Sequence, residues 1–216
     1  MRNTITLFNA AKNAGIRRVV HVSIANPSLD SPLAYYRGKA QVEQAWIDSG
    51  LSYTILRPTV IFGREDILIN NIACFIRHLP VFGVPGDGRY RIRPIYVEDM
   101  VCLMVGAVQR HADETIDAVG PETFSFEELV RLIGAQVGKP ARIMRMPTIL
   151  AYLSTRLAGT FLRDVVLTWQ EYNGLMSNLL APMGPATGQT RLTDWLFLNR
   201  RDLGRRYASE IGRHFR

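Results

Sequence analysis

A tyrosine and a lysine stand four residues apart in the segment Tyr35-Tyr36-Arg37-Gly38-Lys39. On a helix this spacing places both side chains on one face, one turn apart. A free tyrosine has a pKa of about 10 and is a poor base at neutral pH, and a neighbouring ammonium favours its phenolate form. The pair can therefore move a proton to or from a carbinol oxygen while a hydride moves elsewhere. The same pattern fits a packed tyrosine beside an exposed lysine, and the spacing alone leaves both interpretations open.

The elements expected around this pair alternate between helix and strand: a helix over residues 4–14, a strand over 18–23, a helix over 34–48 and a strand over 52–57. Gly15, Ser49-Gly50 and Pro58 provide the stops. Strand, helix and strand at this spacing predict a right-handed βαβ unit with parallel strands.

Beyond residue 58 the alternation continues with a helix over 67–78, a loop and short strand within 81–93, a helix over 97–110, a strand over 115–119, a strand near 141–146, and further helices. Ser125 and Glu128 stand three residues apart at the start of an apolar helical pattern, which predicts a capping box. The alternation predicts an α/β fold with a parallel sheet, followed by a helix-rich region after Pro121.

Composition and charge exclude several function classes. The net charge is +7, yet the arginines are spread along the chain and no nucleic-acid motif accompanies them. Seven arginines fall between Arg191 and Arg216, and we expect a solvated, basic final helix there rather than a nucleic-acid surface. No apolar run is long enough to predict a membrane span. His21, His78, His111 and His214 lie too far apart to predict a metal site.

Two further patterns concern burial. Cys74 and Cys102 stand in apolar stretches, so we expect two buried free thiols and a reducing, cytoplasmic compartment. An apolar stripe interleaved with Arg156 and Arg163 is interpreted as core packing, with a membrane surface or a partner as the alternative; its members are Tyr152, Leu153, Leu157, Phe161 and Leu162.

The order of the motifs resembles the extended and atypical short-chain dehydrogenase/reductases of the epimerase/dehydratase superfamily. The order is a strand ending in Ser23, the pair Tyr35 and Lys39, the run Leu56-Arg57-Pro58-Thr59-Val60-Ile61-Phe62-Gly63, and the run Pro94–Met100 that opens a helix. Within that family the chain is most similar to the subgroup that contains the short-chain-dehydrogenase-like accessory subunit of respiratory complex I.

The resemblance implies a Rossmann-like sheet with a substrate-side lobe, and roles for individual residues. Tyr35, Lys39 and Ser23 would be catalytic. Lys39 would also hold the nicotinamide ribose of NAD or NADP, and Arg57 and Pro58 would lie beside the nicotinamide. Residues 97–99 would line the far side of the site.

The chain also departs from the family pattern. The glycine-rich turn that binds the pyrophosphate is absent, and Gly83, Gly86 and Gly88 do not follow a strand as that turn would. Ile24 and Ala25 occupy the two places where family members carry the catalytic hydroxyl, so Ser23 either substitutes for it or bonds to backbone. We therefore expect residues 1–120 to form a partial dinucleotide-binding domain with weak or no cofactor binding, and 121–216 a helix-rich lobe.

Two functions remain open at this stage. The first is an NAD(P)-dependent oxidoreductase acting on an unidentified small molecule once the missing amino-terminal half is supplied. The second is a non-catalytic binding or assembly subunit with peripheral membrane association. In either case we expect a protein partner to supply or cover the open edge of the strand over 18–23.

Overall fold

The core of the first half is a parallel sheet. The computed structural model describes residues 2–164, 168–209 and 211–212. The sheet has three strands in the order β1 (Arg18–Val22), β2 (Ser52–Pro58) and β7 (Glu114–Ala118), all parallel. Runs of β-branched and aliphatic residues form these strands, and Ile55 and Leu56 in the central one are fully buried. The prediction of an α/β fold with a parallel sheet is confirmed.

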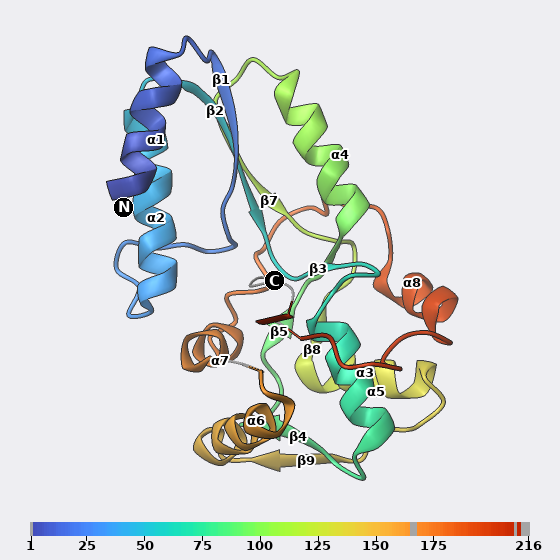
Figure 1. Ribbon diagram of the computed structural model, residues 1–216. Helices are drawn as coiled ribbons and strands as arrows, with labels where there is room; N and C mark the ends of the chain where they lie inside the picture. The colour runs from blue at the N-terminus through green and yellow to red at the C-terminus, as the bar shows by residue number, and fades with distance from the viewer. Residues whose placement is uncertain (1, 165–167, 210, 213–216) are drawn as a thin grey trace.

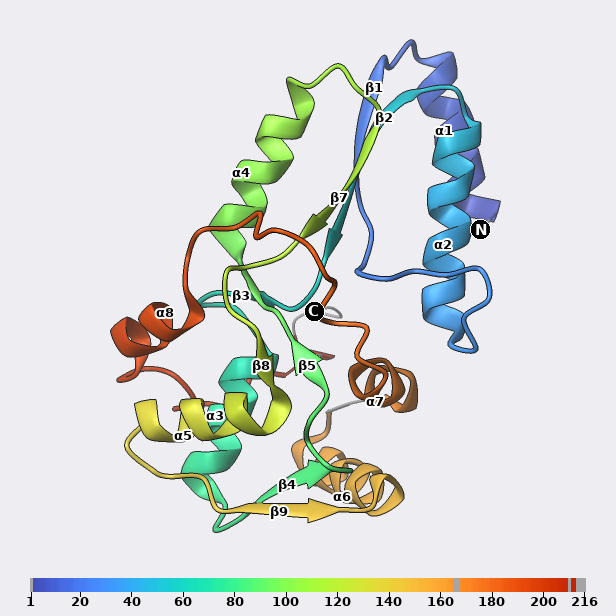
Figure 2. The same cartoon turned by 180° about the vertical axis from the view of Figure 1, so that it is seen from behind.

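Helices cover both faces of this sheet (Figures 1 and 2). On one side lie α1 (Arg2–Asn13) and α2 (Ala34–Asp48), joined through the stacked rings of Phe8 and Trp46. On the other side lies α4 (Val97–Val108), whose Met100 packs with Leu56 of β2. The sequence-predicted bounds of α2 agree with those in the structure.

A second group of elements forms a lobe below the sheet. Its short strands pair as β3 (Ile61–Phe62) with β6 (Ile95–Tyr96), β4 (Phe82–Pro85) with β9 (Ile143–Met146), and β5 (Arg91–Ile92) with β8 (Phe124–Ser125). Two of these pairs join a strand before residue 120 to one after it. The lobe therefore draws on both halves of the chain, and the division at residue 120 stays a prediction.

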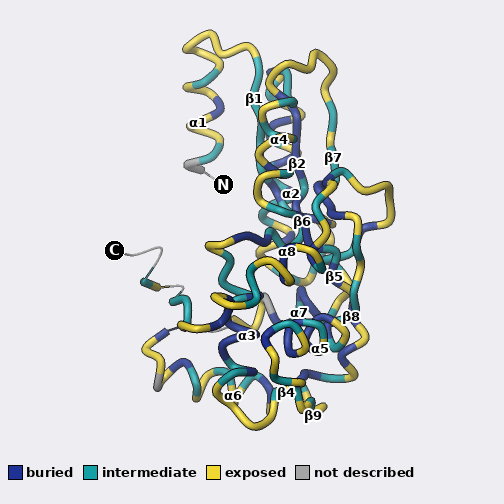
Figure 3. The backbone as a smooth tube through the Cα atoms, turned by 90° about the vertical axis from the view of Figure 1, so that its right-hand side faces the viewer, coloured by how far each residue is buried: buried dark blue, intermediate teal, exposed yellow. Residues whose placement is uncertain are grey.

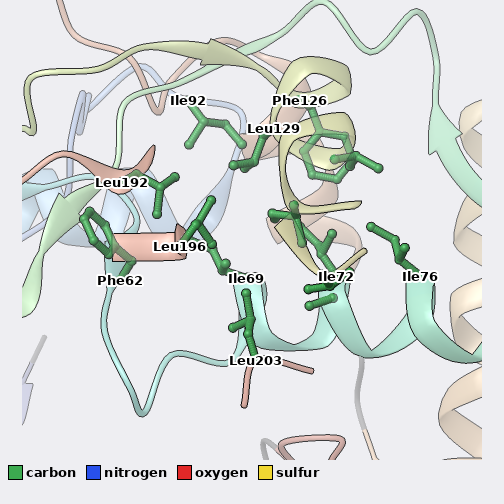
Figure 4. Close-up of a cluster of buried hydrophobic side chains, with 14 of the residues drawn as sticks. Phe62, Ile69, Ile72, Ile76, Ile92, Phe126, Leu129, Leu192, Leu196 and Leu203 are labelled. Carbon is green, nitrogen blue, oxygen red and sulfur yellow. The ribbon is translucent and has the colours of Figure 1, made fainter. Parts of the chain in front are cut away.

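The largest hydrophobic cluster lies in this lobe, between α3 (Leu68–His78), α5 (Phe126–Gln136) and α8 (Leu192–Asn199) (Figure 4). Ile69, Leu129 and Leu196 are fully buried in it. Each such side chain contributes roughly 1.5–3 kcal/mol on burial.

Ser125 and Glu128 form the predicted capping box at the start of α5. The Ser125 hydroxyl accepts from the Glu128 amide at 3.2 Å, and the Glu128 carboxylate accepts from the Ser125 amide at 2.7 Å.

Residues 203–208, here called the tail strap, cross α3. The Asn71 side chain both donates to the carbonyl of Ala208 at 2.9 Å and accepts from its amide at 2.8 Å. Gly204 has a φ of +70°, and a Cβ atom there would lie 2.5 Å from the Ala73 carbonyl carbon. Because no larger residue fits against the α3 backbone, glycine permits this close crossing.

The expectation of a solvated, basic final helix is wrong for residues 192–199, and residues 210 and 213–216 lie outside the described part of the chain. Helix α8 ends at Asn199 and buries Leu192, Trp195 and Leu196. Turns follow it, and Arg191 at its start pairs with Glu122 at 2.9 Å. The burial of these three apolar side chains determines the position of α8, and the many arginines in this stretch gave no indication of it.

The expectations for the two cysteines and for the apolar stripe of residues 152–162 need correction as well. Cys74 is buried as predicted, but Cys102 is exposed on α4. The apolar stripe lies on α6 (Thr148–Leu162), the helix before α7 (Trp169–Met176). Its Leu153 is 54% exposed and its Leu157 is 61% exposed, so core packing is the wrong interpretation for these two residues. The Phe161 side chain lies outside the described residues.

Candidate active site

Tyr35 and Lys39 lie on adjacent turns of α2, as their spacing predicts. The Lys39 Nζ atom is 5.9 Å from the centre of the Tyr35 ring. Tyr35 is 51% exposed and Lys39 is half-buried, so solvent reaches the phenol. The structure therefore places a phenol and an ammonium side by side at an accessible position, and their roles in catalysis remain a prediction.

Tyr36 fixes the start of α2 against the lobe. Its ring is buried, and a Cβ atom at Gly174 of α7 would lie 2.9 Å from its hydroxyl oxygen. Burial, with Tyr35 nearby, raises the pKa of the Tyr36 phenol. The Tyr35 and Tyr36 rings meet edge to face with centroids 5.9 Å apart. Tyr36 thus anchors the helix while its neighbour Tyr35 stays exposed.

Ser23 lies at the carboxyl end of β1, the end at which parallel α/β sheets bind ligands. Its amide donates to the Leu56 carbonyl at 2.8 Å, which continues the sheet pairing past Val22. Its hydroxyl oxygen is buried and has no hydrogen-bond partner among the described residues. The expected hydrogen bond from this hydroxyl to backbone is therefore not formed.

His21, two residues earlier, likewise has an unbonded polar atom. Its Nε2 atom is buried and unbonded within the part of the chain that the structure describes. Burial lowers the pKa of His21, the Lys39 ammonium lowers it further, and the Glu43 carboxylate acts in the opposite direction. The imidazole is therefore held neutral beside the cation of the candidate pair.

Arg57 is occupied by a carboxylate that sequence reasoning missed. The guanidinium of Arg57 donates to both oxygens of Glu43, at 2.6 Å for the shortest contact, and the Glu43 side chain is 5% exposed. Pro58 ends β2, and its carbonyl accepts from the Ala25 amide at 2.8 Å. Arg57 and Pro58, two of the three expected cofactor-binding residues, thus lie beside the Ser23 segment, but Arg57 already has a buried partner. Glu43 lies four residues after Lys39 on the same helix, and nothing else in the sequence indicated that it would bind Arg57.

Residues 97–99 were expected to line the far side of the site, and the structure gives them two different surroundings. Val97 and Glu98 line a cleft of about 980 Å³ that follows β2, together with residues 59 and 61–68 and Tyr96. The carboxylate of Asp99 instead accepts from the amides of Gln189 and Thr190, both at 2.8 Å. Asp99 therefore fastens the loop before α8 and does not face the cleft as a free acid.

The residues present match a nicotinamide cofactor only in part. At the strand ends, Ser23 offers an unbonded buried hydroxyl, and Tyr35 and Lys39 stand close by in sequence. No strand-to-helix connection in the described ranges is a glycine-rich turn. Gly86 and Gly88, with φ of +61° and +70°, instead shape the turn between β4 and β5. The residues that the family resemblance assigns to the nicotinamide side are therefore present, and the described residues contain no glycine-rich cradle for the phosphates.

Neither a metal site nor a membrane-spanning helix is found among the described residues. No group of three or more histidine, cysteine, aspartate or glutamate side chains is arranged to hold a metal ion. None of the described helices combines the length and the apolar character needed to cross a bilayer.

The comparisons with known proteins agree with the fold. The NADPH-dependent quinone oxidoreductase from Escherichia coli, solved with NADPH, superposes with a TM-score of 0.71 over 89% of this chain and 69% of its own, at 20% identity. Subunit 9 of the NADH dehydrogenase [ubiquinone] 1 alpha subcomplex is similar in sequence: the Arabidopsis thaliana protein is 28% identical over 64% of the chain, and the Mus musculus protein 36% over 56%. In sequence the chain is thus similar to part of this complex I subunit, and in fold it is similar to the quinone oxidoreductase.

The matched segment is only part of those relatives. It covers 35% of the Arabidopsis protein and 30% of the mouse protein, so the chain spans about a third of the curated relatives it matches. No family model matches the chain. The superposition on the quinone oxidoreductase establishes the fold, while the activity of the chain is a separate question.

Proposed function

We propose that this chain carries the nicotinamide-facing half of an NAD(P)-dependent oxidoreductase site. The observation that supports this most directly is the Tyr35 ring beside the Lys39 ammonium, at 5.9 Å and open to solvent. A bound nicotinamide would supply or accept the hydride. The Tyr35 hydroxyl would give a proton to, or take one from, the substrate oxygen, and the ammonium of Lys39 would stabilise the phenolate that results.

Ser23 is the third member of the proposed site. Its hydroxyl is buried and unbonded among the described residues, so it is free to hold the substrate oxygen once substrate is present. The cofactor is NAD or NADP, and Lys39 would bind its ribose. Binding by the chain alone should be weak, because the phosphates find no bare amides at a helix amino terminus.

The proposed partner is a protein that covers the edge of β1. In the described chain β1 pairs only with β2, so one row of its backbone groups faces outward. Helix α4, which packs against β1, exposes Val101, Val105 and Val108 on the same part of the molecule. The two free thiols are consistent with a reducing, cytoplasmic location.

The test is replacement of Tyr35 by phenylalanine in a version that binds NADPH, with NADPH oxidation followed by absorbance over a panel of quinones and aldehydes. We expect Tyr35→Phe to lower kcat by roughly 100-fold or more, since only the proton-transferring atom is removed. Tyr53→Phe, in β2, is the matched control and should leave the rate unchanged. A Tyr35→Phe protein as fast as the parent would exclude this role for the phenol.

A non-catalytic binding or assembly function is the second candidate. Two observations favour it: Arg57 is held by Glu43, and the relatives in Arabidopsis and mouse are named as subunits of NADH dehydrogenase. Complementation of a deletion strain separates the two candidates. If Tyr35→Phe still complements while a chain with a charge introduced on the exposed face of α4, Val105→Asp, does not, the fold serves binding rather than proton transfer.

A further inference from the structure

Helix α6 presents an uncovered apolar stripe at the end of the molecule farthest from α1 (Figures 1 and 3). Ile149, Leu150, Leu153 and Leu157 are between 54% and 65% exposed. At 100° per residue these four side chains span an arc of about 100° on the helix. A stripe of four large aliphatic side chains in water is unusual for a helix of a compact domain.

The opposite side of α6 is apolar too, so the helix cannot bury the stripe by turning. Ala151, Thr155 and Ala158 line a cavity of about 290 Å³ whose other walls come from α3, β4, β9 and α7. Turning the stripe inward would bring the small residues out and force four larger side chains against a formed wall. The exposed stripe is therefore a fixed feature of the fold.

A neighbouring side chain extends the stripe. Trp169 of α7 is 43% exposed and packs edge to face on Tyr152 of α6, with ring centroids 5.1 Å apart. We call Ile149, Leu150, Leu153, Leu157 and Trp169 the α6 patch. It combines aliphatic side chains with an indole, the side chain enriched at membrane interfaces.

The stretch of chain that carries α6 has charge of one sign, and the carboxylate that follows it, Asp164, is buried and accepts from the Tyr207 hydroxyl at 2.8 Å. Between Leu129 and Arg163 the sequence contains six arginine or lysine residues and no aspartate or glutamate. Arg131 and Arg145 pair with Glu127, and Lys139 bonds backbone carbonyls. For Arg142, Arg156 and Arg163 the structure gives no ion pair within the described residues, and all three are exposed.

We propose that the α6 patch lies in the headgroup region of a lipid bilayer that carries anionic phospholipid. The apolar side chains would enter the acyl boundary, and Arg142, Arg156 and Arg163 would bind the lipid phosphates. A second copy of this chain is a poorer occupant, because two such patches would bring like charges together. An anionic surface neutralises that charge and covers the stripe at the same time.

The experiment measures binding of the full chain to vesicles of phosphatidylcholine alone and of phosphatidylcholine mixed with phosphatidylglycerol. We expect sedimentation with the mixed vesicles only, weakened by added salt. Tryptophan emission should shift to the blue on binding, and the shift reports Trp169, because Trp46 and Trp195 are already buried at 4% and 7% exposure. The Trp169→Phe variant should therefore bind with little shift.

The decisive variant is Leu153→Gln with Leu157→Gln, which should weaken vesicle binding about tenfold or more. Its matched control is Val101→Gln with Val105→Gln on α4, where the side chains are 50% and 59% exposed, and this control should bind as the parent does. Arg142→Gln with Arg156→Gln, which keeps the apolar patch, should remove the preference for anionic vesicles. Circular dichroism melting checks that each variant folds.

Three results would overturn the proposal. The first is equal binding to neutral and anionic vesicles, and the second is equal loss in the α4 control. The third is a dimer on size exclusion that Leu153→Gln with Leu157→Gln dissolves, without vesicle binding by the parent, because the stripe would then be a contact between copies.

Discussion

At the scale of single residues, His21 connects the candidate site to stability. It lies in the edge strand β1, and its pKa is lowered first by burial and then by the Lys39 ammonium. The unfolded chain has a histidine pKa of about 6.5 and so binds a proton that the folded chain refuses. The stability due to neutral His21 is therefore present above this pH and is lost as the pH falls below it.

We expect the free energy of unfolding to decrease as the pH falls from about 7.5 to about 5.5, and to decrease less in His21→Phe, which has no titrating group at this position. Urea unfolding at the two pH values measures the difference. The exposed His111 provides the control variant His111→Gln. The lowered pKa values of the carboxyl groups of Glu122, Glu127 and Glu128 affect only a more acidic range. Equal pH dependence in the parent and in His21→Phe would contradict this account.

How far the sequence predicts individual contacts depends on the distance along the chain. Tyr35 and Lys39 meet as predicted, because one helix determines both positions. The bond between Arg57 and Glu43 joins a strand to a helix, 14 residues apart, and no local rule pairs them. The sequence left open whether the Ser23 hydroxyl bonds to backbone, and only the packing around the strand end shows that it does not.

At the scale of elements, local chemistry decides where helices begin. The structure confirms the capping box of Ser125 and Glu128, which satisfies two backbone amides at the start of α5. Since α5 contributes Leu129, Val130 and Ile133 to the largest hydrophobic cluster, loosening its first turn affects the lobe core.

Ser125→Ala should lower the free energy of unfolding by about 1 kcal/mol, the usual effect of losing a serine cap. Chemical denaturation followed by circular dichroism measures it. Ser177→Ala is a matched control, since the hydroxyl of Ser177, just after α7, donates back to the Asn173 carbonyl and should matter little. If Ser125→Ala unfolds at the same denaturant concentration as the parent, the cap does not stabilise this lobe.

Periodicity predicted α6 as a helix but not its surroundings. The spacing of apolar residues shows which side chains share a face, and it does not show whether another element covers that face. Core packing was therefore a reasonable interpretation for Leu153 and Leu157, and the structure leaves both exposed. The same limit applies to residues 191–216, where arginine density predicted a solvated helix and Trp195 and Leu196 instead bury their side chains.

At the scale of the whole molecule, the fold class follows from the sequence and the lobe does not. Alternating strands and helices predicted the parallel sheet of β1, β2 and β7. The pairing of β4 with β9 joins residues about 60 apart, Phe82 and Ile143, and short strands of two to four residues carry little pattern of their own. Such pairings are set by packing around the shared core.

The partial site leads to a prediction for the molecule as a whole. A version extended upstream by a strand, a glycine-rich turn and a helix should melt several degrees higher with saturating NADPH, because ligand that binds only the folded state stabilises it. The chain of 216 residues should hardly respond. Thermal melts with and without NADPH measure both. Equal shifts in the two versions would show that this chain holds the cofactor phosphates by another route.

The tail strap has a consequence for synthesis. Asn71 and Ala208 lie 137 residues apart, and the contacts of α3 with residues 203–208 form only after the latter are made. At translation rates of about 5–20 residues per second, the interval between the two is on the order of ten seconds. Throughout it, the Ile69 and Ile72 face of α3 lacks its final cover. We therefore expect the newly synthesised lobe to depend on chaperones that bind α3 until residues 203–208 have left the ribosome and can contact this helix.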